Sequence, residues 1–289
     1  MQLHRMSIIG VGLLGGSIGL AVKSILSDCE IIGYGHRQQT LERACEIGAI
    51  DRGTVDLAEA VARADLIILC TPVGRFTEIL RQMSQALKAG AIVTDVGSTK
   101  ASVVEAASKI LPNTVEFVGS HPIAGSEKRG IDFARADLFQ NALCILTPTP
   151  QTNPAALSAV ETFWQTLGMR TCRMTPADHD RALAEVSHLP HALAAALVAM
   201  QSDEAMQLAG KGFLDTTRIA SGDGGLWRDI FVDNAANMRL AIGKIRAMLN
   251  QFERLLEPDK AEDLRRWLDE ASAKREALLT EKLREVTPD

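Results

Sequence analysis

The stretch Ile8-Ile9-Gly10-Val11-Gly12-Leu13-Leu14-Gly15-Gly16-Ser17 decides the fold of this chain. It follows an apolar run at residues 6–10 that predicts a strand, and it opens a helical pattern at residues 15–26. The first glycine permits a tight turn, the second lets backbone approach a pyrophosphate, and the third lets the helix pack on the sheet. Amides and the dipole at the helix N-terminus favour phosphate. The stretch therefore predicts dinucleotide binding through Gly10, Gly12, Leu13, Leu14 and Gly15.

Short β-branched runs alternate with longer helical patterns after this motif. Further strands are expected at residues 30–34, 66–70, 91–96, 115–119, 142–147 and 170–174, and helices at 39–47 and 75–87. Such alternation is typical of an α/β fold with a parallel, doubly wound sheet. We therefore expect residues 1–174 to form a Rossmann-type dinucleotide-binding domain.

The pattern changes to all-helical at Thr175. This residue can cap a helix, Pro176 suits the first turn, and Asp178 favours the positive end of the helix dipole. Helical patterns then cover residues 177–208, 226–257 and 258–286.

A glycine-rich segment at residues 210–225 interrupts these helices, and we expect it to be a loop that presents binding groups. Residues 175–289 are thus predicted to be an all-α, substrate-binding domain. Because a small helical domain of mixed charge often completes its core across a two-fold axis, we expect a homodimer through the C-terminal helices.

The composition narrows the class of function. A formal net charge of −5 provides no basic excess for nucleic acid or an anionic membrane surface. We expect no signal peptide and no apolar run of membrane-spanning length, and therefore a cytoplasmic protein. The five scattered cysteines form no Cys-x-x-Cys pair and are expected to be reduced core residues.

The end of the second predicted strand bears on the choice of cofactor. An NAD-selective site normally has an acidic residue here to hold the ribose 2′-hydroxyl, but this chain has Gly35 followed by His36 and Arg37. A guanidinium beside a vacated acidic position suits a 2′-phosphate. The sequence favours NADP, and NAD stays open, because both side chains also suit an exposed turn.

Polar residues follow several later strands, at the edge where an open α/β sheet binds its ligand. Thr71 and Pro72 are expected to line the nicotinamide pocket. Ser98 suits either a site hydroxyl or the N-cap of the next helix. His121, in Ser-His-Pro-Ile-Ala-Gly at 120–125, is expected on a loop between a strand and a tight turn, where imidazole can accept a proton near neutral pH.

Five spaced motifs together resemble the prephenate/arogenate (cyclohexadienyl) dehydrogenase family of tyrosine biosynthesis. They are the glycine motif at 10–17, Thr-Asp-Val-Gly-Ser-Thr-Lys at 94–100, His-Pro-Ile-Ala-Gly-Ser-Glu at 121–127, Ser-His-Leu-Pro-His at 187–191 and Asp-Thr-Thr-Arg-Ile-Ala at 215–220. The resemblance implies NAD(P)-dependent oxidative decarboxylation of the small molecule prephenate to 4-hydroxyphenylpyruvate, with arogenate as the alternative substrate.

The same resemblance implies roles for single residues. His121 accepts the proton of the substrate hydroxyl, and Ser98 hydrogen-bonds with it. Arg218 binds the ring carboxylate, a task that suits its planar fork of donors, and His191 lies near the pyruvyl side chain. Four more residues are expected to shape or gate the pocket: Ser126, Glu127, Asp215 and Trp227. We assign no role to His4 or His179.

Other functions fit the sequence less well. A β-hydroxyacid dehydrogenase also joins a Rossmann domain to helices, but it uses a lysine on the first long helix, and residues 176–200 contain none. A dimer that senses NADP without turnover would not need Ser98, His121, His191 and Arg218 together. His188 and His191 lie three residues apart, but without a third ligand we expect no metal.

Overall fold

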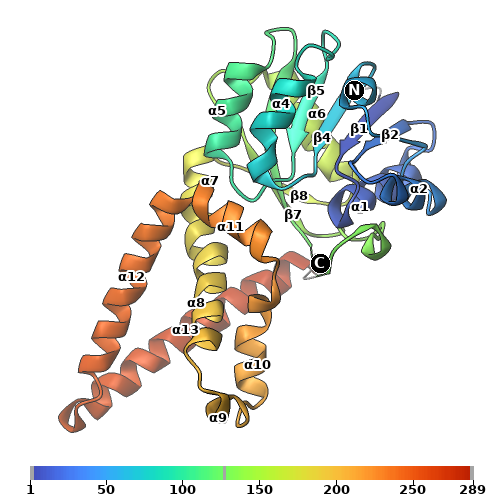
Figure 1. Ribbon diagram of the computed structural model, residues 1–289. Coiled ribbons are helices and arrows are strands. Elements are labelled where there is room, and N and C mark those ends of the chain that lie inside the picture. Colours follow the sequence, from blue (N-terminus) through green and yellow to red (C-terminus); the bar gives the residue numbers. More distant parts are fainter. Residues whose placement is uncertain (1–2, 126–127, 287–289) are drawn as a thin grey trace. The chain divides into compact units, whose positions relative to one another are not determined.

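The computed structural model of the protein describes residues 3–125 and 128–286 (Figure 1). The chain divides into two compact units, Met1–Ala235 and Ala236–Asp289. The first unit contains a sheet with helices on both faces and then a run of helices, and the second contains two long helices. The predicted boundary between residues 174 and 175 stays a prediction.

Eight strands form one sheet in the order β3-β2-β1-β4-β5-β6-β7-β8. Neighbouring strands are parallel except for β6 and β7, which pair antiparallel, with His121 opposite Ile145. The doubly wound, mostly parallel sheet is thus confirmed, and the antiparallel β6–β7 pair is a departure that the sequence pattern did not predict. The strands are β1 (Arg5–Ile9), β2 (Glu30–Tyr34), β3 (Arg52–Thr54), β4 (Leu66–Leu69), β5 (Ile92–Asp95), β6 (Glu116–Ile123), β7 (Leu143–Thr147) and β8 (Arg170–Arg173).

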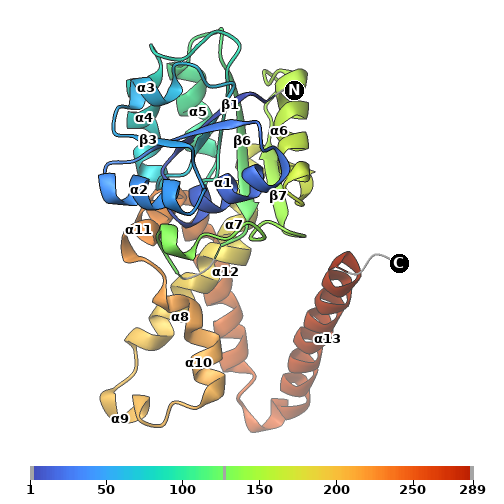
Figure 2. The ribbon, with the colours of Figure 1, turned by 90° about the vertical axis from the view of Figure 1, so that its right-hand side faces the viewer.

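Side chains of the central strands alternate between two buried cores. In β4, Leu66 and Ile68 join one core while Ile67 and Leu69 join the other. Helices α1, α2 and α6 cover the first core and α3, α4 and α5 cover the second; Figure 2 shows α3, α4 and α5 on the left of the sheet and α6 on the right. The helices are α1 (Leu13–Ile25), α2 (Gln38–Glu46), α3 (Leu57–Val61), α4 (Phe76–Met83), α5 (Ala101–Ile110) and α6 (Pro154–Thr166).

Side chains cap the first turns of the helices on either side of β8. Thr175 accepts a hydrogen bond from the Asp178 amide at 3.1 Å, which confirms the helix start predicted there. Asn153 caps α6, with Pro154 in its first turn. Such caps satisfy amides that the first turn of a helix leaves without backbone partners.

A nearly continuous helical rod follows β8. It consists of α7 (Pro176–Leu183), a π-helical segment (Ala184–His188) and α8 (Leu189–Ala199). The predicted loop at residues 210–225 is mostly helical, because it contains α10 (Lys211–Thr217), a 3-10 turn (Arg218–Ser221) and the start of α11. The short helix α9 (Asp203–Met206) precedes it, and α11 (Gly224–Asp233) follows.

The predicted helix over residues 226–257 is broken at Asn234, and its second part is α12 (Ala235–Arg254). The last described helix is α13 (Ala261–Val286). These two helices leave many large apolar side chains exposed. They include Leu240, Ile242, Met248, Leu249, Leu268, Leu278 and Leu279.

The helical rod at residues 176–199 is also long and apolar enough to cross a membrane, by length and composition only. The expectation that no run reaches this length is therefore wrong. The rod carries Asp180, His188 and His191, all at most 5% exposed, in the first compact unit. These three side chains are buried, although most of the apolar window of the rod is not.

Candidate active site

A cavity of about 620 Å³ lies at the carboxyl ends of the parallel strands, within the first compact unit. Segments that follow β1, β4, β5 and β6 line one side, and α8, the 3-10 turn and α11 contribute the rest. The described lining comprises residues 12–14, 70–73, 96–98, 124–125, 128–130, 191, 218–219, 222–223, 226–227 and 230. Open α/β sheets bind their ligands at this edge, and the volume suits small molecules.

The glycine turn leads from β1 into α1 at one end of this cavity. Gly10 has a φ of +106°, and a Cβ there would lie 2.9 Å from the Cys70 carbonyl carbon. Gly15 approaches the turn so closely that its Cβ would stand 2.1 Å from the Gly10 carbonyl oxygen. Gly12 is the N-cap of α1, and a Cβ there would meet no atom within 4 Å. No side chain therefore caps the first amides of this helix. The first amides of α1 are thus presented to the cavity, as a pyrophosphate requires.

Next to this turn, Thr71 Oγ1 is buried without a hydrogen-bond partner among the described residues. Thr71 and Pro72 line the cavity directly after β4. A buried hydroxyl without a partner indicates a place for a polar ligand group. These residues and the open glycine turn fit a nicotinamide dinucleotide.

His36 and Arg37 lie beyond the end of β2 and are exposed. Arg37 Nε is 3.3 Å from His36 Nε2, so the two side chains lie together in front of α2. Gly35 has room for a Cβ, with the nearest atom, Leu41 Cδ2, at 3.4 Å. Neither side chain belongs to the described cavity lining.

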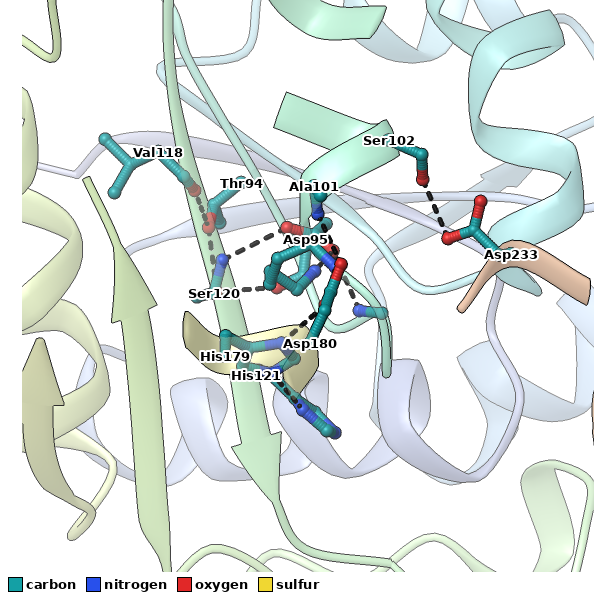
Figure 3. Close-up of polar contacts among 12 residues, drawn as sticks. Thr94, Asp95, Ala101, Ser102, Val118, Ser120, His121, His179, Asp180 and Asp233 are labelled. Atoms are coloured by element: carbon teal, nitrogen blue, oxygen red, sulfur yellow. Dashed lines mark hydrogen bonds and ion pairs between the residues drawn. The ribbon is translucent and has the colours of Figure 1, made fainter. Parts of the chain in front are cut away.

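A buried ion pair holds the end of β5 beside β6. Lys100 Nζ contacts Asp95 Oδ2, and both side chains are 0% exposed. The Asp95 carboxylate also accepts hydrogen bonds from the Gly97 amide at 2.8 Å and the Ser120 amide at 3.1 Å. These bonds hold the end of β5 against Ser120, the residue before His121, and Figure 3 shows the contact of Asp95 with Ser120.

His121 lies within β6 and is 8% exposed, so the predicted loop position is wrong. The strand extends past residue 119 because residues 119–123 pair with β7, an antiparallel partner that the sequence pattern did not reveal. Ser98 lines the cavity, but no hydrogen bond joins Ser98 to His121 among the described residues. The backbone of Ser98 instead bonds the ring of His188.

His121 has another partner, which sequence reasoning missed. Its Nδ1 is 2.9 Å from His179 Nε2, and His179 Nδ1 is 2.8 Å from Asp180 Oδ1 (Figure 3). Asp180 accepts the amides of Lys100 and Ala101 at 2.7 and 2.9 Å, in the first turn of α5. Histidine followed by aspartate at a helix start was the only available signal, and it matches no known motif.

His188 and His191 project from the junction of the π-helical segment and α8. Their rings contact Trp227 of α11: His191 stacks on it with centroids 3.6 Å apart, and His188 meets it edge-on at 6.1 Å. His191 Nδ1 is buried without a hydrogen-bond partner among the described residues. Because His191 lines the cavity, this atom is available to a ligand, and π-helical segments are frequent at functional sites.

Arg218, in the 3-10 turn after α10, is exposed and lines the cavity, whereas Asp215 is exposed and lies outside its described lining. Arg129 and Asp223, which both line the cavity, form another ion pair. Ser126 and Glu127, both predicted to lie at the pocket, are outside the described residues.

The buried histidines are held neutral near pH 7. The pKa of His121 lies well below its ordinary value. Burial is the largest cause, and the nearby His179, Lys100 and His188 lower the pKa further. Burial lowers the pKa of His188 to about 4, and it also lowers that of His191. A neutral imidazole can accept a proton.

Two family models match consecutive parts of the chain. Residues 18–173 match the nucleotide-binding domain of prephenate dehydrogenase, and residues 175–270 match its dimerization domain. The cyclohexadienyl dehydrogenase of Zymomonas mobilis is 34% identical over 96% of this chain and 97% of its own length. This chain belongs to the prephenate dehydrogenase family.

Solved structures of the prephenate dehydrogenase family agree. The Aquifex aeolicus prephenate dehydrogenase, in complex with hydroxyphenyl propionate and NAD+, is 35% identical with a TM-score of 0.91, covering 96% of this chain and 99% of that one. The Synechocystis arogenate dehydrogenase is 33% identical with a TM-score of 0.82, covering 95% and 99%. The chain is therefore a nicotinamide-dependent oxidoreductase.

The first compact unit of this prephenate dehydrogenase family member thus brings most of the predicted site residues to one cavity. The glycine turn, Thr71, Pro72, Ser98, His191, Arg218 and Trp227 line the cavity. Among the described residues, no group of three or more histidine, cysteine, aspartate or glutamate side chains is placed to hold a metal ion.

Proposed function

We propose that the protein is a prephenate dehydrogenase, which oxidises and decarboxylates prephenate to 4-hydroxyphenylpyruvate with a nicotinamide cofactor. One observation carries the proposal: the open glycine turn shares a cavity with Arg218, His191 and Ser98. His121 is buried in β6 outside the described lining, and the same strand leads to Ala124 and Gly125 in that lining. Membership of the family supplies the reaction class.

The cofactor is proposed to lie against the turn after β1 and the hydroxyl of Thr71. Leu13 and Leu14 line the same end of the cavity. When bound, the nicotinamide supplies the acceptor for the hydride that leaves the carbinol carbon of the substrate.

His121 is the proposed proton acceptor. Because its lowered pKa keeps the imidazole neutral, Nε2 can take the proton of the ring hydroxyl as the carbon is oxidised. Loss of the ring carboxylate as CO2 then makes the ring aromatic. The ring oxygen takes its proton back, so His121 ends the cycle neutral. Ser98, at the cavity wall, is proposed to orient the hydroxyl.

The two substrate carboxylates require cations or donors. Arg218 is proposed to bind the ring carboxylate, since a guanidinium forms two parallel bonds with it. His191, stacked on Trp227, is proposed to contact the pyruvyl side chain. The gating roles of Asp215, Ser126 and Glu127 remain predictions.

The described lining favours prephenate over arogenate. Arogenate carries an ammonium group where prephenate carries a keto oxygen, so it needs an acceptor, and among the described lining residues the only carboxylate is Asp223. That carboxylate is already paired with Arg129. A cavity lined by Lys128 and Arg218, beside this ion pair, suits a substrate with two negative charges.

For the cofactor we propose a preference for NADP, supported by the paired Arg37 and His36 side chains after β2. We further propose a homodimer formed through the dimerization domain, whose α12 and α13 expose large apolar side chains. A cytoplasmic location is proposed from the family.

The test follows reduced nicotinamide by absorbance with prephenate or arogenate, each with NAD or NADP. Turnover of prephenate with an aromatic keto acid product is expected, and His121→Asn should lower kcat about 10²–10⁴-fold. Turnover of arogenate alone, or an unchanged kcat in the variant, contradicts the proposal. Light scattering at several protein concentrations tests the dimer.

A further inference from the structure

Two buried polar residues stand directly behind His121 and have no part in the mechanism above. His179 is 0% exposed and Asp180 is 4% exposed. Together with His121 they form a chain of hydrogen bonds, from His121 Nδ1 to His179 Nε2 and from His179 Nδ1 to Asp180 Oδ1 (Figure 3). This chain of hydrogen bonds leads from the strand β6 through α7 to the first turn of α5.

Asp180 is an ionised acceptor at the end of this chain. Burial raises the pKa of its carboxyl, but hydrogen bonds from His179 and from the amides of Ala101 and Lys100 outweigh burial and lower it. The amide of Lys100 donates to Oδ1 and that of Ala101 to Oδ2. A carboxylate only accepts hydrogen bonds, so the contact with His179 requires a proton on His179 Nδ1.

The direction of this bond passes on to His121. Burial lowers the pKa of both imidazoles, so each carries one ring proton near neutral pH. With its proton on Nδ1, His179 offers a lone pair at Nε2. A hydrogen bond of 2.9 Å between the two rings then requires the proton of His121 on Nδ1.

We propose that His179 and Asp180 are positioning residues that hold His121 in the Nδ1–H tautomer and so leave Nε2 as its basic atom. The inference rests on the proposed function only for the identity of the proton that His121 accepts. When Nε2 takes the hydroxyl proton, the O–H bond breaks and the Nε2–H bond forms. The positive charge on His121 is then stabilised through His179 by the buried carboxylate.

The hydrogen-bond chain also accounts for Ser98, which makes no bond to His121 among the described residues. Orientation of the imidazole is supplied from the Nδ1 side, so the serine is left to the substrate. A structural role alone would hold the ring in place without fixing which nitrogen carries the proton. The tautomer is therefore the property to measure.

Direct evidence comes from long-range ¹H–¹⁵N spectra of the full-length protein labelled at histidine, recorded near neutral pH. His121→Asn identifies the resonances of His121 by their loss. A proton on Nδ1 and a free Nε2 are expected. A proton on Nε2 overturns the proposal, whatever the activity of the protein.

Two substitutions at His179 separate polarity from packing. His179→Phe fills similar space without either hydrogen bond, and His179→Gln offers an amide oxygen to His121 and an N–H to Asp180. The phenylalanine variant should lose about 10²–10³-fold in kcat, with little change in KM or in cofactor affinity. The glutamine variant should regain at least about tenfold of that loss. Asp180 itself is a poorer test, because it also caps α5.

The outcomes distinguish this inference from the proposed function. Equal kcat values for His179→Phe and wild type, or equal losses in the two variants, overturn the positioning role. If the phenylalanine variant does not fold, the wild-type tautomer and the glutamine variant decide. A wild-type protein with the expected tautomer but no turnover of prephenate keeps the hydrogen-bond chain and overturns the proposed function.

Discussion

Gly12 and Gly15 belong to one turn but have opposite surroundings, so alanine at each position should fail in a different way. A Cβ on Gly12 meets no heavy atom within 4 Å, and one on Gly15 would stand 2.1 Å from the Gly10 carbonyl oxygen and 2.8 Å from an Ile8 methyl carbon. Gly12 has φ −90° and ψ −150°, an extended conformation that alanine adopts. Gly12→Ala should therefore fold normally. In Gly15→Ala, the first turn of α1 should no longer pack closely against Gly10 and Ile8.

The magnitudes follow from these contacts. Gly12→Ala should change the free energy of unfolding by less than about 1 kcal/mol, since a poorer helix cap is offset by a stiffer unfolded chain. Its methyl group occupies the space before the first amides of α1. Loss of one charged hydrogen bond to phosphate, about 1.5–3 kcal/mol, raises the Kd of the cofactor about 10–150-fold. Gly15→Ala should lower the free energy of unfolding by about 1–3 kcal/mol.

Calorimetric titration with NAD and NADP measures the Kd values, and thermal unfolding measures stability. Gly210→Ala is a matched control, because Gly210 caps α10 with φ −89°, has no heavy atom within 4 Å of a Cβ and lies outside the described cavity lining. The control should bind as wild type does. A wild-type Kd in Gly12→Ala would refute the assignment of this turn to the pyrophosphate, and wild-type stability in Gly15→Ala would refute the argument from close packing.

Four further predictions follow from the site. Lys100→Met leaves the Asp95 carboxylate buried without its partner and should lower stability by about 3–5 kcal/mol in denaturant titrations, with partial recovery when Asp95→Asn is added. On the acid side, kcat/KM should begin to fall only below pH 6.5. The pKa of His121 is lowered, so its imidazole stays unprotonated until the pH drops below that pKa. Arg218→Ala should raise the KM for prephenate more than it lowers kcat, since the contact exists in ground and transition states alike. Arg37→Ala should reduce a preference for NADP by about tenfold or more in kcat/KM, and equal values for both cofactors in wild type would contradict that reading.

Local patterns in the sequence predicted the elements that carry the cofactor. The glycine turn, the strands β1, β2, β4 and β5 and the helix start at Thr175 each depend on residues close together in the chain. The short β3 was missed because three residues show no periodicity. The strand at β7 was predicted, but its antiparallel pairing with β6 was not, because a strand sequence does not state the direction of its partner.

The sequence predicted some residues of the site and missed others, because only those that belong to local motifs can be recognised from the sequence. Ser98, His191 and Arg218 line the cavity as motifs indicated. The contact of His121 with His179 joins residues 58 positions apart and needs the crossing of β6 and α7. Neither residue's own sequence environment indicates that crossing, so His179 received no role.

The π-helical segment explains how one rod serves both His121 and the cavity. In a regular α-helix, His179 and His191 would differ by about 120° around the axis, because they are twelve residues apart. A π-bulge absorbs about one extra residue, which leaves a difference of about 20°. His179 and His191 then share a face, one bonding His121 and the other stacking on Trp227 at the cavity. The irregularity lies at Ala184–His188, where a helical sequence pattern alone predicts an unbroken helix.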